Sequence, residues 1–248
     1  MNTRKYIHIH IMGGGSVILL LDTILVPASL LITISYHAYL YHYLRHKPSL
    51  TTIGLNAMKR RCWLRELNQG DDKKGMLAIQ SLRNTLMATI LTATVTIIIS
   101  LCLAALTNNT FDAANHLLNL RLNNNNGHSA NFFGLQSGKI IVLKYGSASI
   151  FLLASFLCSS MAIACLVDAN FLINALGDFS SFPDYTETVM ERGFTMAVVG
   201  NRVLCTTFPL LMWMFGPVPV ALSSLALVGA LYELDFPTTT IKSNTTSS

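Results

Sequence analysis

The chain has 248 residues, of which 52% are hydrophobic and only 12% are charged, and its formal net charge is +5 at pH 7. Soluble domains carry about 25% charged residues, so this chain lacks the polar surface needed to cover a soluble core of its size. The composition therefore excludes an ordinary soluble domain and predicts an integral membrane protein.

The first predicted element is an apolar run over residues 16–43, preceded by a segment of mixed polarity, residues 1–15. The run is longer than the apolar part of a signal peptide and lacks a small-residue cleavage site, so we expect a retained membrane helix. It ends in YHAYLYHYLRHKP, which resembles an interfacial aromatic belt followed by basic residues, with Pro48 ending the helix. The three histidines of this stretch do not converge on one face, so we predict no metal site.

The next segment, residues 45–84, is a basic loop that contains nine of the seventeen Lys and Arg residues. Because Lys and Arg are enriched in cytoplasmic loops, we expect this loop to be cytoplasmic and the N-terminus to lie outside. Within it, residues 51–67 place a tryptophan and aliphatic residues among basic ones, which predicts an amphipathic helix lying on the membrane surface. The candidates for contact with anionic lipid head groups are Lys59, Arg60, Arg61, Trp63 and Arg65. A loop held against a membrane disfavours nucleic acid as a partner.

The second and third predicted spans, residues 85–107 and 146–167, each carry small residues along one helical face. These residues are Thr85, Thr89, Thr92, Thr96 and Ser100 in the second span, and Ala148, Ser155, Ser159 and Ala162 in the third. Such faces let helices approach closely and form hydrogen bonds across the contact, and a hydrated path is the alternative interpretation.

The segment between these spans, residues 108–138, is predicted to be an outer loop. Asn108 begins a glycosylation sequon, which is compatible with an external face. The asparagine-rich run that follows has no periodicity and predicts disorder.

The last apolar segment, residues 194–232, is too long for one straight span. Pro217 and Pro219 lack backbone N–H donors and end or bend a helix, which favours a helical hairpin with arms at 194–214 and 218–232. The sequence thus predicts an all-α integral membrane bundle of three plain transmembrane helices plus a proline-broken fourth segment. The hairpin gives five spans, and the alternative, a single kinked span, gives four. We expect one membrane domain, residues 16–236, and a disordered tail, residues 237–248.

Three polar residues within the spans are candidates for function, because charge inside a membrane is energetically costly: Asp22, Asn201 and Arg202. Asp22 either lines an ion or proton path or is an interface carboxylate that water still reaches. Arg202 either reaches lipid phosphates or pairs with an acid, for which Asp168 and Asp178 are the nearest in depth.

Signatures of enzymes are absent from the sequence. It contains no glycine-rich phosphate loop on a strand–helix unit, no serine elbow and no H-E-x-x-H motif. The five cysteines form no C-x-x-C pair. We therefore predict no catalytic residue, no cofactor and no metal, and a protein that is not an enzyme.

Several motifs occur together in one order, and their joint pattern resembles a known family. They are YH at 36–37, TTIG at 51–54, KRRCW at 59–63, DDKKGMLAIQSLRNTLMA at 71–88 and GNRVLCTTFPLLMWMFGP at 200–217. In this order and spacing the chain resembles the plant multi-pass membrane proteins of domain-of-unknown-function family 599. The resemblance implies a plant protein of the secretory pathway or plasma membrane, and it implies no biochemical activity.

Two functions remain open at this point. The intramembrane polar residues favour a small transporter or channel component, which would act as a homo-oligomer if it forms a pore. The basic loop favours the alternative, a non-catalytic membrane scaffold or signalling adaptor. The expected partners are the lipid bilayer and anionic lipid head groups.

Overall fold

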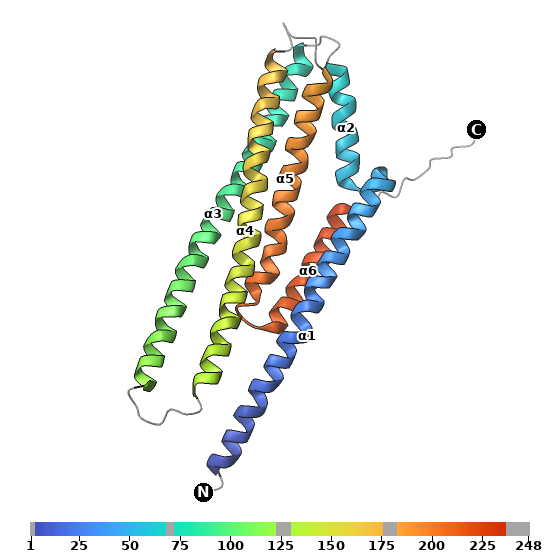
Figure 1. Ribbon diagram of the computed structural model, residues 1–248. Helices are drawn as coiled ribbons and strands as arrows, with labels where there is room; N and C mark the ends of the chain where they lie inside the picture. Colours follow the sequence, from blue (N-terminus) through green and yellow to red (C-terminus); the bar gives the residue numbers. More distant parts are fainter. Residues whose placement is uncertain (1–2, 68–71, 123–129, 176–182, 237–248) are drawn as a thin grey trace, which may run out of the picture.

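The computed structural model describes residues 3–67, 72–122, 130–175 and 183–236 (Figure 1). The chain forms α1 (Thr3–His46), the short 3₁₀ helix η1 (Pro48–Leu50), α2 (Thr52–Leu67), α3 (Asp72–Leu122), α4 (Ala130–Ala175), α5 (Pro183–Met212) and α6 (Pro217–Asp235). No strand occurs in these ranges. Five of the helices are long and apolar enough to cross a membrane, so the predicted all-α membrane bundle is confirmed.

The helical hairpin is confirmed as well, and the single kinked span is wrong. α5 ends at Met212, the chain turns, and α6 begins at Pro217. Gly216 has φ +131°, a conformation that side-chain-bearing residues rarely adopt. Pro217 occupies the first turn of α6, where a missing N–H costs no helical hydrogen bond. Local backbone chemistry at these two residues therefore reverses the chain.

Several helices extend beyond the spans predicted from hydropathy. α1 already begins at Thr3, so most of the segment 1–15 is helical. α3 continues to Leu122 and α4 begins at Ala130, so the predicted outer loop at 108–138 is helical on both flanks, and so are both ends of the run 119–134 that was predicted to be disordered. The alanines and leucines of residues 111–122 are strong helix formers, which accounts for the extension. The predicted disordered tail, 237–248, lies outside the described residues.

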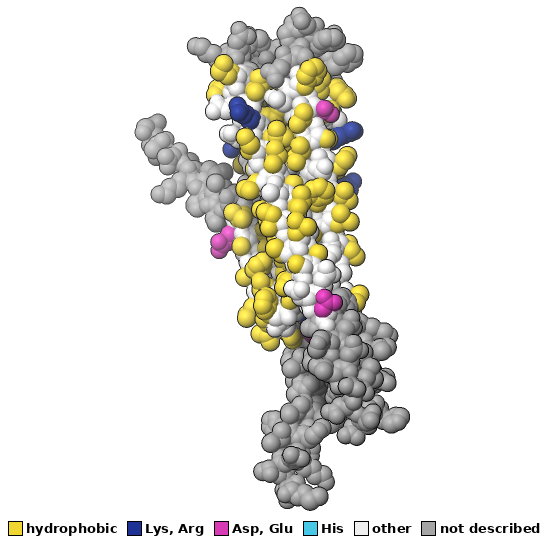
Figure 2. All heavy atoms as spheres, turned by 90° about the vertical axis from the view of Figure 1, so that its left-hand side faces the viewer, with side chains coloured by type: hydrophobic (Ala, Val, Ile, Leu, Met, Phe, Trp, Pro, Cys, Tyr) yellow, Lys and Arg dark blue, Asp and Glu magenta, His cyan; other side chains and the backbone are white. Residues whose placement is uncertain are grey.

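The five long helices pack in the order α3, α4, α5, α6, α1 (Figure 1). α4 packs along both α3 and α5, and α6 lies against both α5 and α1. One end of the bundle gathers the C-terminal ends of α1, α4 and α6 with α2, and we call it the α2 end. Figure 2 shows a face dominated by hydrophobic and uncharged side chains over its middle, with Lys and Arg towards the α2 end. This distribution is typical of a surface that contacts lipid.

The small-residue faces serve helix packing, as the first of the two interpretations predicted. Ser155 and Ser159 are fully buried in α4, and Thr96 of α3 is fully buried opposite them. The Ser155 hydroxyl donates to the Gly200 carbonyl of α5 at 2.8 Å and lies 3.5 Å from the Thr96 hydroxyl. A Cβ on Gly200 would come within 2.7 Å of the Ser159 hydroxyl, so close approach of α4 and α5 requires glycine there.

The basic segment forms a helix, α2, and its position on the membrane surface stays a prediction. α2 runs beside α5 along the bundle axis (Figure 1). Its Trp63 packs against the apolar cluster of Leu82, Leu166, Ala169, Ile173, Val189 and Met190. Because α3, α4 and α5 extend past the α2 end of α1 and α6, they offer Trp63 an apolar contact within the protein. The side chain is therefore half-buried in protein.

Candidate functional site

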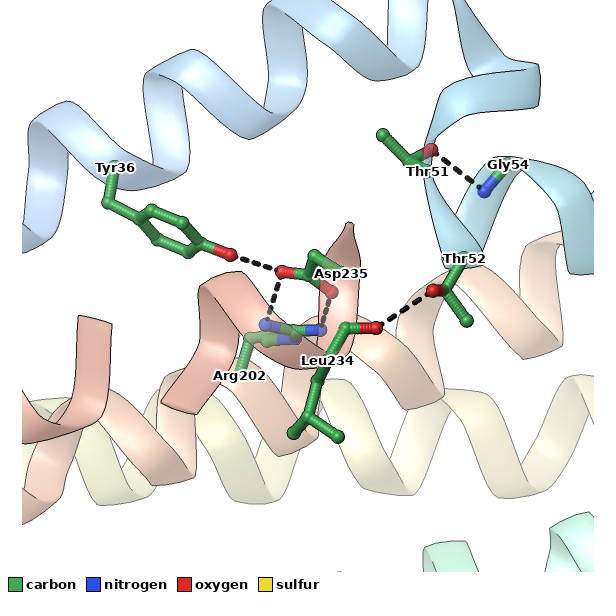
Figure 3. Close-up of polar contacts among 7 residues, drawn as sticks. All are labelled: Tyr36, Thr51, Thr52, Gly54, Arg202, Leu234 and Asp235. Atoms are coloured by element: carbon green, nitrogen blue, oxygen red, sulfur yellow. Dashed lines mark hydrogen bonds and ion pairs between the residues drawn. The ribbon is translucent and has the colours of Figure 1, made fainter. Parts of the chain in front are cut away.

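A polar cluster joins three helices near the α2 end of the bundle (Figure 3). Arg202 of α5 donates two hydrogen bonds to the Asp235 carboxylate of α6, one of them at 2.9 Å. The Tyr36 hydroxyl of α1 donates to the same carboxylate at 2.5 Å. Asp235 is 1% exposed and the Arg202 side chain 16% exposed, so this is a nearly buried ion pair. We call these three residues the Asp235 cluster.

The Asp235 cluster corrects two predictions. Arg202 does pair with an acid, but Asp168 is exposed elsewhere on α4 and Asp178 lies outside the described residues. Asp235 lies three residues beyond the predicted span, which ends at residue 232, whereas α6 runs to Asp235. Tyr36, predicted to belong to an aromatic belt, points inward and is only 7% exposed.

The first turn of α2 is attached to the same end of α6. The Thr52 hydroxyl donates to the Leu234 carbonyl at 2.8 Å (Figure 3). The Gly54 N–H donates to the Thr51 hydroxyl at 3.2 Å, which caps the start of α2. α2 therefore starts from a fixed point beside the Asp235 cluster.

A second polar network lies at the opposite end of the spans, around Asp22. The Asp22 carboxylate accepts a hydrogen bond from the Trp213 indole at 3.1 Å and lies 3.7 Å from the Lys144 ammonium. Lys144 in turn donates to the Trp213 carbonyl at 3.1 Å. Asp22 therefore has protein partners on α4 and at the α5–α6 turn. With a rise of about 1.5 Å per residue, Asp22 and Tyr36 stand roughly 21 Å apart along α1.

A groove between α1 and α5 connects the two networks. It consists of two cavities, one of about 590 Å³ bordered by Asp22 and Trp213, and one of about 640 Å³ bordered by Arg202 and α2. Thr206 of α5 borders both cavities. We call the whole feature the α1–α5 groove and its second part the α2-end cavity. Asn201, the third predicted residue, is exposed and borders neither cavity.

The wall of the α2-end cavity contains one polar atom without a partner. His37 Nδ1 lies 2.8 Å from the Thr33 carbonyl, but His37 Nε2 is buried and has no hydrogen-bond partner among the described residues. His42 and His46 stack on each other instead, with ring centroids 4.2 Å apart. In the part of the chain that the structure describes, no group of three or more His, Cys, Asp or Glu residues is arranged to hold a metal ion.

The predicted lipid-contact residues of α2 have different surroundings. Arg61 donates to both oxygens of the Glu191 carboxylate, and this hydrogen bonding raises the pKa of Arg61. Arg60 is half-buried with its guanidinium 4.1 Å from the centre of the Phe194 ring, and burial lowers its pKa. Lys59 is exposed, and the side chain of Arg65 lies outside the described residues.

Arg60 and Arg61 therefore differ in whether their guanidinium groups are already paired with a carboxylate. Both border the α2-end cavity. Within the described ranges no carboxylate lies at ion-pair distance from Arg60, whereas Arg61 is neutralised by its own partner. The Arg60 guanidinium, which borders the α2-end cavity, therefore keeps N–H donors available for an anion.

The sequence comparisons give the chain a family. The family model described as "Protein of unknown function, DUF599" matches residues 24–240. The chain belongs to this family. The match covers four of the membrane spans in full and the first from its third residue, so the Asp235 cluster and the α2-end cavity lie within the DUF599 region and Asp22 lies two residues before it. No curated protein and no solved structure matches the chain.

Proposed function

We propose that this DUF599 protein is a small membrane carrier whose solute path is the α1–α5 groove. The observation that carries the proposal is that Thr206 borders both cavities, so the two cavities adjoin at this residue. Volumes of about 590 and 640 Å³ fall within the range of small-molecule sites, roughly 300–1,000 Å³. Carriers commonly bind their solute near the middle of the membrane, between elements that move against each other.

The two polar networks support a specific way of opening the path. α1 is held by the Asp235 cluster at one end of the groove and by the Asp22 network at the other. Releasing one network while keeping the other would let α1 tilt and open the groove at one end only. Asp22 and Arg202 would then hold α1 in the closed position. They would not bind transported ions themselves, because each already has an ion-pair partner.

Transport into proteoliposomes tests the proposal. The purified protein would be reconstituted into liposomes. Uptake of ions, of organic acids and of fluorescent phospholipids would then be measured in separate assays. We expect flux of one class, and we expect Thr206→Phe to reduce it at least tenfold because the aromatic ring would fill the space where the two cavities adjoin. Thr94→Phe is the matched control, because Thr94 is exposed on α3 away from the groove.

Absence of flux for every solute class would overturn the proposal that the protein is a carrier. It would favour the alternative of a non-catalytic membrane scaffold or adaptor that acts through α2. The proposed path involves no bond-making step, so it requires no enzyme activity. Both walls of the groove come from one chain, so a homo-oligomer is not needed for it.

A further inference from the structure

We infer that the α2-end cavity binds one anionic phospholipid, with its phosphate on Arg60 and an acyl chain along the walls formed by α1 and α5. The inference rests on the proposed function, in that such a lipid would be the carrier's cargo. It names the class of molecule that the groove accepts.

Charge at the mouth of the cavity selects an anion. Among the described residues no carboxylate lies within ion-pair distance of Arg60, and the nearby Glu191, which attracts Arg60 without a direct contact, is already paired with Arg61 at the border of the cavity. Lys59, the preceding residue, is exposed and does not border this cavity. A guanidinium presents several N–H donors in one plane, which matches the oxygens of a phosphate. The contact with the face of the Phe194 ring holds the Arg60 guanidinium in place and leaves its N–H groups free to donate hydrogen bonds.

The walls of the cavity select a molecule with a long apolar chain. They are formed largely by aliphatic side chains, among them Leu40 and Leu44 of α1 and Val198 and Val203 of α5. From Phe194 to Thr206, two residues of α5 that line the cavity, α5 rises about 18 Å at roughly 1.5 Å per residue. One leaflet of a bilayer has a hydrocarbon depth of about 15 Å, half of the usual ~30 Å. A free phosphate would leave these walls uncovered, whereas an acyl chain covers them.

The position of the cavity is consistent with a lipid from the adjoining leaflet. α2, the helix that contains Arg60, runs beside α5 at one end of the bundle (Figure 1), and we place the phosphate groups of one leaflet at this end. The cavity continues from there towards the middle of α5. A lipid would therefore enter with its head group already at the correct depth.

Native mass spectrometry of the full-length protein in detergent tests this site. We expect one copy of dioleoyl phosphatidic acid to bind at least tenfold more tightly than dioleoyl phosphatidylcholine. Arg60→Gln should weaken phosphatidic acid about tenfold, while Lys59→Gln, which removes the same charge from an exposed position, should change it less than twofold. Arg60→Lys should restore part of the affinity, and circular dichroism would verify that each variant is folded.

A second pair of variants tests the acyl-chain site. Val203→Phe narrows the cavity and should weaken phosphatidic acid at least fivefold, whereas Ile150→Phe, on an exposed position of α4, should not. Glycerol phosphate at millimolar concentration should not displace the lipid. Displacement by glycerol phosphate would mean that the site accepts a soluble anion, and it would overturn the inference.

The remaining outcomes separate the lipid from the carrier. Several equivalent bound copies that Arg60→Gln does not affect would indicate non-specific surface lipid and would overturn the inference. Specific binding without lipid flux in proteoliposomes would keep the site and reject transport of this cargo. Flux of another solute without phosphatidic acid binding would keep the carrier and reject the lipid.

Discussion

Asp235 is the residue whose replacement tests the packing of this bundle most directly. Its carboxylate accepts two hydrogen bonds from Arg202 and one from Tyr36, and it is 1% exposed. In Asp235→Asn the side chain keeps its shape, but the negative charge is lost and one acceptor oxygen becomes an amide donor. That donor would face either a guanidinium N–H or the tyrosine hydroxyl. Arg202 is left as a nearly buried cation without a counter-ion.

The magnitude follows from these contacts. Polar contacts between membrane helices average about 0.6 kcal/mol each and reach about 1.7 kcal/mol. Breaking a fully buried ion pair costs about 3–5 kcal/mol in soluble proteins. The Arg202 side chain is 16% exposed and borders a cavity, so part of its charge remains solvated. We therefore expect Asp235→Asn to lower the free energy of unfolding by about 2–3 kcal/mol, between these limits.

Thermal unfolding in detergent, followed by circular dichroism, measures the effect. For a chain of this size about 1 kcal/mol corresponds to roughly 2–4 °C, so the Tm should fall by about 4–12 °C. Asp168→Asn is the matched control, because Asp168 is exposed on α4, and its Tm should stay within about 1 °C of the wild type.

A double variant distinguishes an unpaired charge from a loss of packing. Arg202→Met combined with Asp235→Leu removes both charges, and it should recover at least half of the lost Tm. A fall in Tm of less than about 1 °C in Asp235→Asn would refute the reasoning, because the ion pair would then contribute nothing to stability. A double variant less stable than Asp235→Asn would show that shape and not charge holds the three helices together.

Three further predictions follow from the packing and the topology. Gly200→Ala should lower the free energy of unfolding by about 1–3 kcal/mol, because the added methyl group overpacks against α4. Gly146→Ala, whose added methyl group meets no atom within 4 Å, should leave it unchanged, and equal Tm values for the two variants would contradict the close α4–α5 contact. Thr96→Val should lower the free energy of unfolding by about 0.5–1.5 kcal/mol, and the exposed Thr94→Val should lower it by less than about 0.3 kcal/mol. A larger loss from Thr94→Val than from Thr96→Val would argue against the helix-packing interpretation. In a variant whose sole cysteine is Cys62, an impermeant maleimide should label the exposed thiol only after the cytoplasmic face is opened, and labelling of intact cells would reverse the predicted orientation.

The membrane spans could be predicted from the sequence because their determinants are local. A run of about 20 apolar residues must cross a bilayer whatever its neighbours are, so composition and length were sufficient. The reversal at Gly216 and Pro217 was equally local, since proline and glycine act on the backbone of their own turn. The small face that contains Ser155 and Ser159 was visible as a helical repeat, and its burial followed from that pattern.

The partners of the charged residues were decided only by tertiary structure. Tyr36 and Asp235 are separated by 199 positions, and they meet because α6 packs between α1 and α5. Depth in the membrane alone suggested Asp168 and Asp178 for Arg202, since a hydropathy profile contains no information on which helices are neighbours. The α1–α5 groove likewise has no sequence pattern, because it is the space left where α1 rests on α6 instead of α5. Sequence thus determined which segments cross the membrane, and the order in which they pack determined where charge and open volume meet.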